Sequence, residues 1–520
     1  MKKILATILA LVMALALTAT VWADGDGTAS GSMTGADFLA KAKNGAITLA
    51  NDVTLSTSCS ISDGQTYTIN LNGHTLSADN TTIMLRHGKL IVNGTGTIKE
   101  NAPNFGAIMI KGSVNSADTN YSVVEVNAGV ILEGWSPIFV DQNVKKAYGV
   151  SVTVNGATLN ARKDTAGASG TGVYVNGQIT DENNAPVISL TNTKICDVDN
   201  ASQGMYLAGY ATTTLTNCDI TGVTGVEIRA GKLTVSGGAI TGTATPVTVT
   251  PDGNGSTTVG AGIALAQHTT KLPVIVTIEN ATVKGYTGVY ESNPQNNDTD
   301  SIAKVNLTIS GGNFEAINNG TNAVHSEDCT NFITGGTFSS AVDTTYLADT
   351  VNYKVSGTNS VSYFTNLNDA MAAANAEDEI TNVREEPVPG SGYTVKLIDN
   401  NTVIATLHSG ASSVALPTLS KSGYTFKGWK EENGSTVYTD KYTPKQSKEV
   451  EGDEIVPVEG EFKLYAVWSA NSYYYYPSTS TTDSTTGKAS PKTFDAGIGV
   501  YAVTAVLSLT GLAYTGKKKF

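Results

Sequence analysis

Charged residues are scarce in this sequence, since Asp, Glu, Lys and Arg together make up only 15% of its 520 residues. Low charge combined with many β-branched residues favours β structure over helix or disorder. The net charge is −13 at pH 7, which argues against nucleic acid as a partner because phosphate contacts need Lys and Arg. The length predicts about two to four domains.

Cysteine is also rare. The four cysteines, Cys59, Cys196, Cys218 and Cys329, are scattered along a long chain, so a disulfide framework is weakly supported and buried thiols are the favoured interpretation. No Cys-x-x-Cys sequence or His pair at a ligand spacing occurs. We therefore predict no metal site and no cofactor.

Long apolar runs are confined to the two ends of the chain. Residues 1–23 have two lysines, an apolar stretch and a small-residue exit, which predicts a secretory signal peptide. Residues 496–514 carry no charge and precede three lysines at 517–519. This stretch is long enough to cross a bilayer as a helix, with the lysines on the cytoplasmic side.

Between these ends, one short pattern recurs: an apolar residue, any residue, an apolar anchor, a polar residue, a Gly or Asn, two small or polar residues, and a closing apolar residue. The anchors are Leu71, Val92, Val126, Val154, Leu190, Leu215, Val235, Ile278, Ile309 and Ile333. The closing residues are Leu76, Ile98, Ile131, Leu159, Ile195, Ile220, Ile240, Val283, Phe314 and Phe338. Irregular spacing of a fixed pattern is typical of a coiled repeat with loops inserted into its turns.

The residue two after each anchor indicates a bend. It is Gly73, Gly94, Gly156, Asn192, Asn217, Gly237, Asn280, Gly311 or Gly335, with Ala128 as the exception. Gly and Asn tolerate left-handed backbone, so a positive φ is predicted at each of these positions. A second apolar–variable–apolar pattern follows each anchor. Two strands per turn predict an all-β fold, a right-handed parallel β-helix of about ten or more turns with strands stacked about 4.8 Å apart.

The middle residue of the second pattern should point outward, opposite to its buried neighbours. These positions form an aromatic and Met stripe with Glu227 and Ala264 between its members: Met84, Met109, Phe139, Tyr174, Tyr206 and Tyr290. An exposed apolar stripe often marks a contact surface, and aromatic faces can stack on sugar rings. The alternative is that long loops, such as residues 241–261, fold back over the stripe.

Residues 34–43 have helical spacing with Thr34 as a possible N-cap, and we expect this helix to cap the first turn. ITLANDVTL and YTINLNGHTLS near the start, with LTISGGNF and FITGGTFSSAVDTTYLAD near residue 335, resemble pectin-lyase-like surface proteins of Gram-positive bacteria. The resemblance covers about residues 34–355 and implies a fold and a cell-surface location. We therefore assign residues 24–355 to the capping helix and β-helix.

Residues 356–391 are predicted to hold a short helix, at 367–375, and an acidic linker. Residues 392–469 resemble the Listeria–Bacteroides repeat, the internalin-type B repeat, through Pro417, Gly423, Tyr424, Phe426, Gly428, Trp429, Leu464, Tyr465, Ala466 and Trp468. The resemblance implies a small β-grasp-like module. Its tryptophans are expected chiefly in the core.

Residues 470–490 are rich in Ser, Thr and Tyr and predict a solvated stalk. Residues 491–520 then combine a motif, an apolar span and a basic tail, and resemble a sortase sorting signal of the Leu-Pro-x-Thr-Gly type. The motif residues are Pro491, Lys492, Thr493 and Phe494, where Ser490 replaces the family's Leu and Phe494 its Gly. The resemblance implies cleavage between Thr493 and Phe494 by a sortase-type transpeptidase and attachment to the cell wall. The alternative is a retained membrane anchor.

Polysaccharide lyases and hydrolases need converging carboxylates, or carboxylates that hold Ca²⁺ beside a basic residue. The densest candidate group is Asp197, Asp199, Asp219, Glu227 and Arg229. These acids occupy different positions of the repeat, and the Asn-Thr-Asp, Asp-Asp and Gly-His-Gly signatures of polygalacturonases do not occur. We therefore expect a non-catalytic, wall-attached adhesin-like protein that binds glycans or host surface proteins. A carbohydrate-active β-helix enzyme is the alternative.

Overall fold

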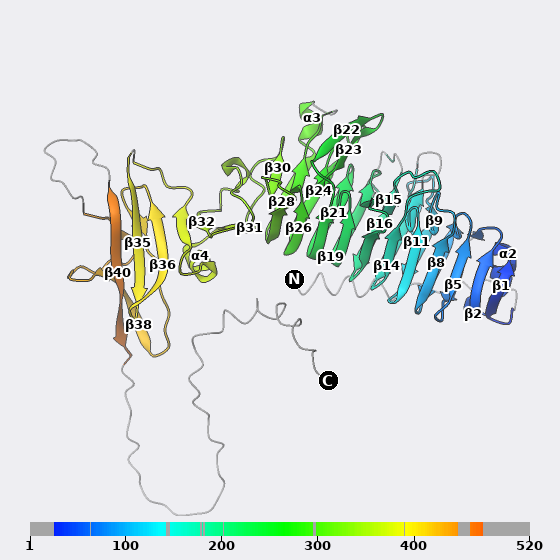
Figure 1. Ribbon diagram of the computed structural model, residues 1–520, viewed down its shortest axis with the longest axis horizontal. Coiled ribbons are helices and arrows are strands. Elements are labelled where there is room, and N and C mark those ends of the chain that lie inside the picture. The colour runs from blue at the N-terminus through cyan, green and yellow to red at the C-terminus, as the bar shows by residue number, and fades with distance from the viewer. Residues whose placement is uncertain are drawn as a thin grey trace, which may run out of the picture. The chain divides into compact units, whose positions relative to one another are not determined.

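The computed structural model describes residues 25–62, 64–141, 146–176, 179, 182–200, 202–294, 298–388, 390–445 and 458–471. The predicted signal peptide, nearly all of the stalk, the sorting motif and the apolar span at 496–514 lie outside the described residues. The described chain is mostly β-strand (Figure 1). It divides into two compact units, one of residues up to Val351 with Asn359–Tyr363, and one of Asn352–Thr358 with residues from Phe364.

One face of the first unit is a ten-stranded sheet, here called sheet B, whose strands follow one another in chain order. All its neighbouring strands are parallel. Each next strand therefore comes from the next turn of the chain. The strands are β3 (Cys59–Ile61), β6 (Ile83–Leu85), β9 (Ile108–Lys111), β12 (Ile138–Asp141), β15 (Thr171–Val175), β18 (Gln203–Leu207), β20 (Val226–Ile228), β24 (Ala261–Leu265), β27 (Thr287–Glu291) and β30 (Val324–Ser326).

The rest of each turn forms two strand stretches on either side of a bend, so a full turn carries three stretches and not the two that the sequence predicted. The anchor stretches are β2 (Ala46–Leu55), β4 (Gln65–Asn70), β7 (Gly88–Asn93), β10 (Ser122–Val126), β13 (Val150–Asn155), β16 (Val187–Thr191), β25 (Val274–Glu279) and β28 (Val305–Ile309). The closing stretches are β5 (Thr75–Ala78), β8 (Gly96–Glu100), β11 (Val130–Gly134), β14 (Thr158–Ala161), β17 (Lys194–Asp197), β26 (Ala281–Gly285), β29 (Gly312–Ala316) and β31 (Gly336–Phe338). In β19 (Ala211–Gly222) and β21 (Gly231–Gly242), as in β2, one strand runs through the bend.

The predicted anchors form one buried column from Val92 to Ile333, and each pairs in register with the next. Two predicted members were wrong. Ile69, not Leu71, pairs with Val92, and Leu132, not Ile131, pairs with both Ile98 and Leu159. In the second case the bend after Val126 is one residue longer than the pattern allows.

The predicted left-handed bends are present at seven positions: Gly73, Gly94, Gly156, Asn192, Asn217, Gly237 and Asn280. In the three other copies the positive φ falls one residue later, at Gly129, Gly312 and Gly336. A Cβ at Gly312 would lie 2.3 Å from the carbonyl oxygen of Ala281 on the preceding turn, so close stacking as well as φ requires glycine there.

The predicted N-terminal helix is α2 (Gly35–Ala40), and Thr34 is its N-cap, with its hydroxyl accepting from Asp37 N at 3.1 Å. Phe38 is fully buried, and the helix packs against β3, the first strand of sheet B. An unpredicted strand, β1 (Thr28–Met33), precedes the helix and pairs in parallel with β2. The first turn is thus covered by a strand and a helix together.

The second unit is a mixed sheet, and it includes the segment that the sequence predicted to be a linker. In spatial order its strands are β32 (Tyr353–Ser356), β34 (Glu379–Asn382), β36 (Thr402–Ser409), β35 (Gly392–Asp399), β40 (Glu459–Ala470) and β38 (Tyr424–Glu431). The linker prediction was wrong for β34, because Ile380 is buried and the strand pairs on both sides. The short helix was predicted correctly and is α4 (Leu367–Ala373).

The core of this unit contains Trp429, fully buried, whose Nε1 donates to Pro417 O at 2.8 Å. Trp468 is half-buried and donates to Asp399 Oδ1 at 2.9 Å. Other short elements of the described residues are β33 (Val361–Phe364), β37 (Val414–Ala415), β39 (Lys441–Tyr442), α3 (Thr299–Ile302) and the 3₁₀ turn Thr344–Tyr346. Among the described residues, no helix has the length and apolarity needed to cross a bilayer.

The stacked column makes a direct stability prediction. Leu215→Ala removes a fully buried side chain that lies between Leu190 and Val235, and should lower the free energy of unfolding by about 2–5 kcal/mol. The neighbouring Thr214 is exposed, so Thr214→Ala should change it by less than about 0.5 kcal/mol. Urea denaturation followed by circular dichroism measures both. Equal effects of the two substitutions would contradict the column.

Candidate functional site

The predicted stripe lies in register on the outer face of sheet B. Each member pairs with the next, from Met84 through Met109, Phe139, Tyr174, Tyr206, Glu227 and Ala264 to Tyr290. Its exposure differs from the prediction, because Met109 and Phe139 are only 5% and 7% exposed. Met84, Tyr174, Tyr206 and Tyr290 remain partly exposed.

The aromatic rings of the stripe pack on one another. The Phe139 and Tyr174 rings are stacked with centroids 4.9 Å apart, and the Tyr206 ring follows at 5.4 Å, tilted by 35°. Since stacking occupies ring faces, Tyr174 presents mainly its ring edge and hydroxyl to the surface. The expected stacking of sugars on a row of open ring faces therefore does not fit this part of the stripe.

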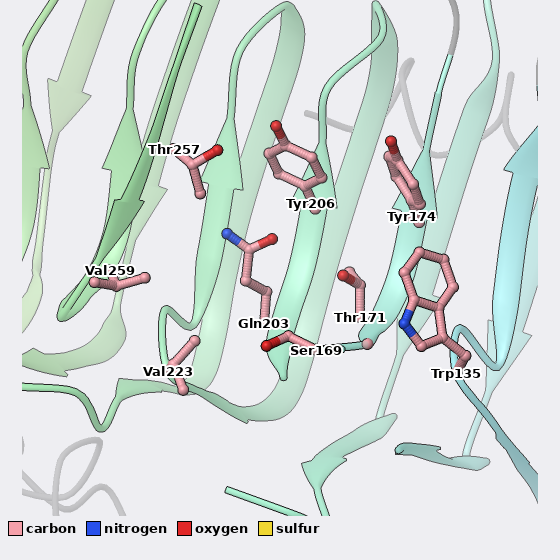
Figure 2. A pocket seen from close by; sticks show the side chains of 10 residues that line it. Trp135, Ser169, Thr171, Tyr174, Gln203, Tyr206, Val223, Thr257 and Val259 are labelled. Carbon is pink, nitrogen blue, oxygen red and sulfur yellow. The ribbon is translucent and has the colours of Figure 1, made fainter. Parts of the chain in front are cut away.

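A pocket opens on this face over the paired strands that carry Tyr174 and Tyr206 (Figure 2). Its volume is about 300 Å³. The residues that line it are Trp135, Ser169, Gly170, Thr171, Tyr174, Gln203, Tyr206, Val223, Thr257 and Val259. Thr171 and Gln203 are partners on adjacent strands, so the floor of the pocket is part of the regular sheet.

Trp135, which the sequence analysis did not single out, forms one wall of the pocket. It follows directly after β11, and its ring contacts the Phe139 and Tyr174 rings edge-on, at 6.2 and 6.1 Å between centroids. Its backbone N donates to Glu100 Oε2 at 3.2 Å. Glu100 is fully buried and also accepts from Asn104 N and Phe105 N, each at 2.9 Å. A buried carboxylate thus fixes the turn that carries Trp135.

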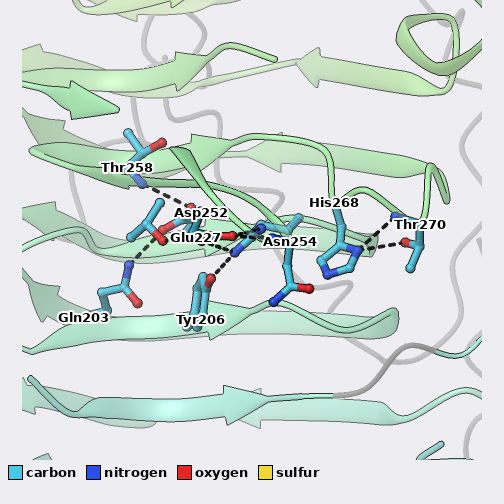
Figure 3. A network of polar contacts seen from close by, with 10 residues as sticks. Gln203, Tyr206, Glu227, Asp252, Asn254, Thr258, His268 and Thr270 are labelled. Atoms are coloured by element: carbon cyan, nitrogen blue, oxygen red, sulfur yellow. Dashed lines mark hydrogen bonds and ion pairs between the residues drawn. The ribbon is translucent and has the colours of Figure 1, made fainter. Parts of the chain in front are cut away.

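The opposite wall is the antiparallel hairpin of β22 (Thr248–Asp252) and β23 (Gly255–Val259), which lies within the insert 241–261. Thr257 and Val259 face the pocket. Beneath the hairpin, fully buried Glu227 accepts from Gln203 Nε2 at 2.8 Å and from Thr258 N at 3.1 Å (Figure 3). The expected covering loop is therefore present over Glu227, whereas Tyr174 and Tyr206 still line the open pocket.

Arg229 ties the hairpin to the sheet. It is 2% exposed, and its Nη1 and Nη2 donate to the two oxygens of Asp252 at 3.0 and 3.1 Å. Nη1 also donates to the Tyr206 hydroxyl. Burial would raise the pKa of Asp252, but the hydrogen bonds from Arg229, Asn254 N and Thr257, together with the Arg229 charge, outweigh it and leave the pKa lowered. The cation is thus neutralised within the wall of the site.

Burial also changes the protonation of nearby groups. Desolvation raises the pKa of Glu227 to about 8 and that of Tyr174 to about 12. Desolvation, and then the nearby Arg229 charge, lower the pKa of His268 to about 4. Near neutral pH the Tyr174 hydroxyl and the His268 ring are uncharged.

The acidic group proposed from the sequence does not converge. Asp199 accepts from Arg162 Nε at 3.2 Å and from Lys163 N at 2.8 Å. Asp219 is exposed on β19, whereas Glu227 lies on β20 of sheet B and Arg229 directly follows that strand. In the part of the chain that the structure describes, no three His, Cys, Asp or Glu side chains are grouped so that they could hold a metal ion.

All four cysteines are free thiols. Cys59, Cys218 and Cys329 are buried, in agreement with the preferred prediction, and Cys196 is half-buried beside Asn160 of the preceding turn. Burial raises the pKa of the Cys59 thiol to about 12, so it has little thiolate character.

Comparison with known proteins adds no family assignment: no model of a protein family matches the chain, and no curated protein sequence matches it significantly.

The buried Glu227 predicts a pH dependence of stability. Its folded pKa of about 8 exceeds the unfolded value of about 4.3, so between these values the folded protein holds a proton that the unfolded chain releases. This stabilising contribution is complete below the unfolded pKa and is lost as the pH rises through the folded pKa, by at most about 1.4 kcal/mol per pH unit.

Glu227→Gln abolishes this titration, so the wild type should lose stability relative to the variant as the pH rises across this window. Urea denaturation at several pH values measures the difference in free energy of unfolding between the two proteins. The other buried carboxyl groups are present in both, so their titration cancels in this difference. Glu279→Gln, which changes an exposed carboxyl, serves as the control. A difference in free energy of unfolding between wild type and Glu227→Gln that does not change with pH would contradict the raised pKa of Glu227.

Proposed function

We propose that this chain is a non-catalytic, wall-attached surface protein of a Gram-positive bacterium that binds glycans through the pocket on sheet B. In this proposal the first unit is a right-handed parallel β-helix, and the second is a β-grasp-like module of the Listeria–Bacteroides repeat type. The parallel pairing of successive turns supports the first assignment, and the mixed sheet with parallel β35 and β40 supports the second.

The observation that carries the proposal is the position of the pocket. It lies on the aromatic stripe that the sequence marked as a contact surface, and it includes two stripe members, Tyr174 and Tyr206, with Trp135 beside them. Aromatic side chains combined with hydroxyl and amide groups are typical of ligand sites in which an apolar surface and a few polar groups fix the orientation. A stiff stack of turns holds the groups of such a site in fixed positions.

A non-catalytic role is supported by the state of the acidic groups near the pocket. Both carboxyl oxygens of Glu227 accept hydrogen bonds from the protein, and both oxygens of Asp252 accept from Arg229. General acid–base hydrolysis needs carboxyl groups that reach the scissile bond. These two carboxyl groups instead hold the hairpin and Gln203 in place.

Attachment is proposed from the two ends of the chain. Residues 1–23 would direct secretion, and the stalk at 470–490 would hold the folded units off the wall. A sortase-type transpeptidase would cleave at Thr493 after the span 496–514 has paused in the membrane. Without cleavage the same span would keep the protein on the membrane as its anchor.

Binding can be tested with the secreted full-length chain on a glycan array that also carries extracellular matrix proteins. Tyr174→Ser removes a ring and a hydroxyl from the pocket and should reduce the glycan signal at least about tenfold, a loss typical of a central aromatic contact. Tyr290→Ser is the matched control, because Tyr290 belongs to the same stripe but lies outside the pocket, stacked on His325.

Circular dichroism should be unchanged in both variants. Glycan binding that is equal in the wild type and both variants, or no glycan binding at all, would refute the proposed function.

Attachment can be tested separately in cells. Thr493→Ala should block cleavage, so that the protein moves from the wall fraction, released by muralytic enzymes, to the membrane fraction. Lys492→Ala changes the variable position of the motif and should leave wall attachment intact. Immunoblots of the two fractions measure the outcome, and a wild-type protein found only in the membrane fraction would favour the retained anchor.

A further inference from the structure

We infer that the pocket on sheet B binds an uncharged sugar residue, a neutral hexose or an N-acetylhexosamine, and discriminates against uronic acids and sulfated sugars. This inference rests on the proposed function and specifies the ligand of the same site. It follows from the polar groups of the pocket, from the distribution of charge around it, and from its size.

The walls of the pocket carry no formal charge. Its ten lining residues are three aromatics, two valines, a glycine, three hydroxyl residues and one amide. Such a surface matches a sugar ring, which has apolar C–H faces and neutral hydroxyls at its rim. At about 300 Å³ the pocket is at the small end of the usual range of ligand pockets, roughly 300–1,000 Å³, and suits one or two sugar residues.

Gln203 supplies an oriented acceptor. Its Nε2 donates to buried Glu227 at 2.8 Å, which holds the amide plane so that Oε1 is available to accept from a ligand hydroxyl. Figure 2 shows this amide between Thr257 and Tyr206, within the pocket. Because Glu227 also accepts from Thr258 N of the hairpin, the acceptor and the hairpin wall are fixed by the same carboxyl group.

Trp135 supplies an unused donor. Its Nε1 has no hydrogen-bond partner among the described residues. Figure 2 shows this nitrogen on the side of the indole that faces Thr171. A ligand oxygen seated between Trp135 and Thr171 would satisfy it. Donor, acceptor and hydroxyls together form a neutral hydrogen-bonding set that a polyhydroxylated ring can use.

An acidic sugar would find no counter-charge in this pocket. Arg229, the cation behind Tyr206, is 2% exposed, is not among the lining residues, and already forms a two-bond ion pair with Asp252. Moving a carboxylate or sulfate from water into such a site is unfavourable. The net charge of −13 further opposes the approach of polyanionic chains.

The test is calorimetric titration of the full-length secreted chain with two sets of oligosaccharides of two to four residues. The neutral set contains gluco-, manno-, galacto- and chito-oligosaccharides, and the acidic set contains oligogalacturonides and heparin fragments. At least one neutral oligosaccharide should bind, and every acidic one should bind at least about tenfold more weakly, as expected when a charge is desolvated without a partner.

Trp135→Phe keeps an aromatic ring and removes the Nε1 donor, and should weaken binding of the neutral sugar about fivefold or more, the loss of one hydrogen bond. Trp468→Phe is the matched control, because Trp468 also loses an indole donor, to Asp399, but lies in the second unit. If Trp135→Phe alters the thermal melt, Thr171→Val, which removes only a hydroxyl from the pocket, replaces it with the same expected direction.

The outcomes separate this inference from the proposed function. Preference for an acidic oligosaccharide, or binding that is lost in Tyr174→Ser and directed only to a matrix protein, would overturn the neutral-sugar assignment. A preference for acidic oligosaccharides that is lost in Tyr174→Ser would still leave the pocket as a glycan-binding site. Neutral binding that is unchanged in both Trp135→Phe and Thr171→Val would place the sugar elsewhere and also overturn the inference.

Discussion

The structure of the first unit depends on the in-register parallel pairing of successive turns. Each turn contributes its backbone groups to the turn before and the turn after, so every residue is held level with its equivalents along the stack. Apolar side chains at equivalent inward positions then form continuous columns, such as the one through Leu190, Leu215 and Val235. Outward side chains at equivalent positions are brought together in the same way, whether or not their contact stabilises the fold.

The pocket on sheet B depends on this outward alignment. Phe139, Tyr174 and Tyr206 lie on successive turns, 35 and 32 residues apart in sequence, and their rings pack at 4.9 and 5.4 Å because their strands are in register. Of these stacked rings, Tyr174 and Tyr206 line the pocket. The sheet therefore positions Thr171, Tyr174, Gln203 and Tyr206 of the pocket, whereas Trp135 and the hairpin supply its two walls.

Buried glutamates hold these loops. Glu100 accepts three backbone N–H groups around Trp135, and Glu227 joins Gln203 to the hairpin strand β23. Farther along, Glu291 accepts from Ser326 Oγ and from the backbone N of Glu327 and Asp328. Burial raises the pKa of each of the three carboxyl groups. Desolvating a carboxyl group is costly, and hydrogen bonds from several donors offset that cost at each of the three. Irregular segments are in this way fastened to a regular stack.

The local sequence pattern determined the strands, the direction of their side chains and most of the bends, because alternation and a left-handed Gly or Asn depend on a few adjacent residues. It identified Tyr174 and Tyr206 as outward members of a stripe. It assigned Leu71 and Ile131 to the columns where Ile69 and Leu132 belong, because the neighbouring turn decides which residue of a bend is level with it. Only the tertiary structure determined which stripe members stay open. That depends on Trp135 and on a hairpin whose Thr258 N donates to Glu227, 31 positions earlier in the sequence. Contacts of this kind have no period in the sequence, and they convert an exposed stripe into a pocket.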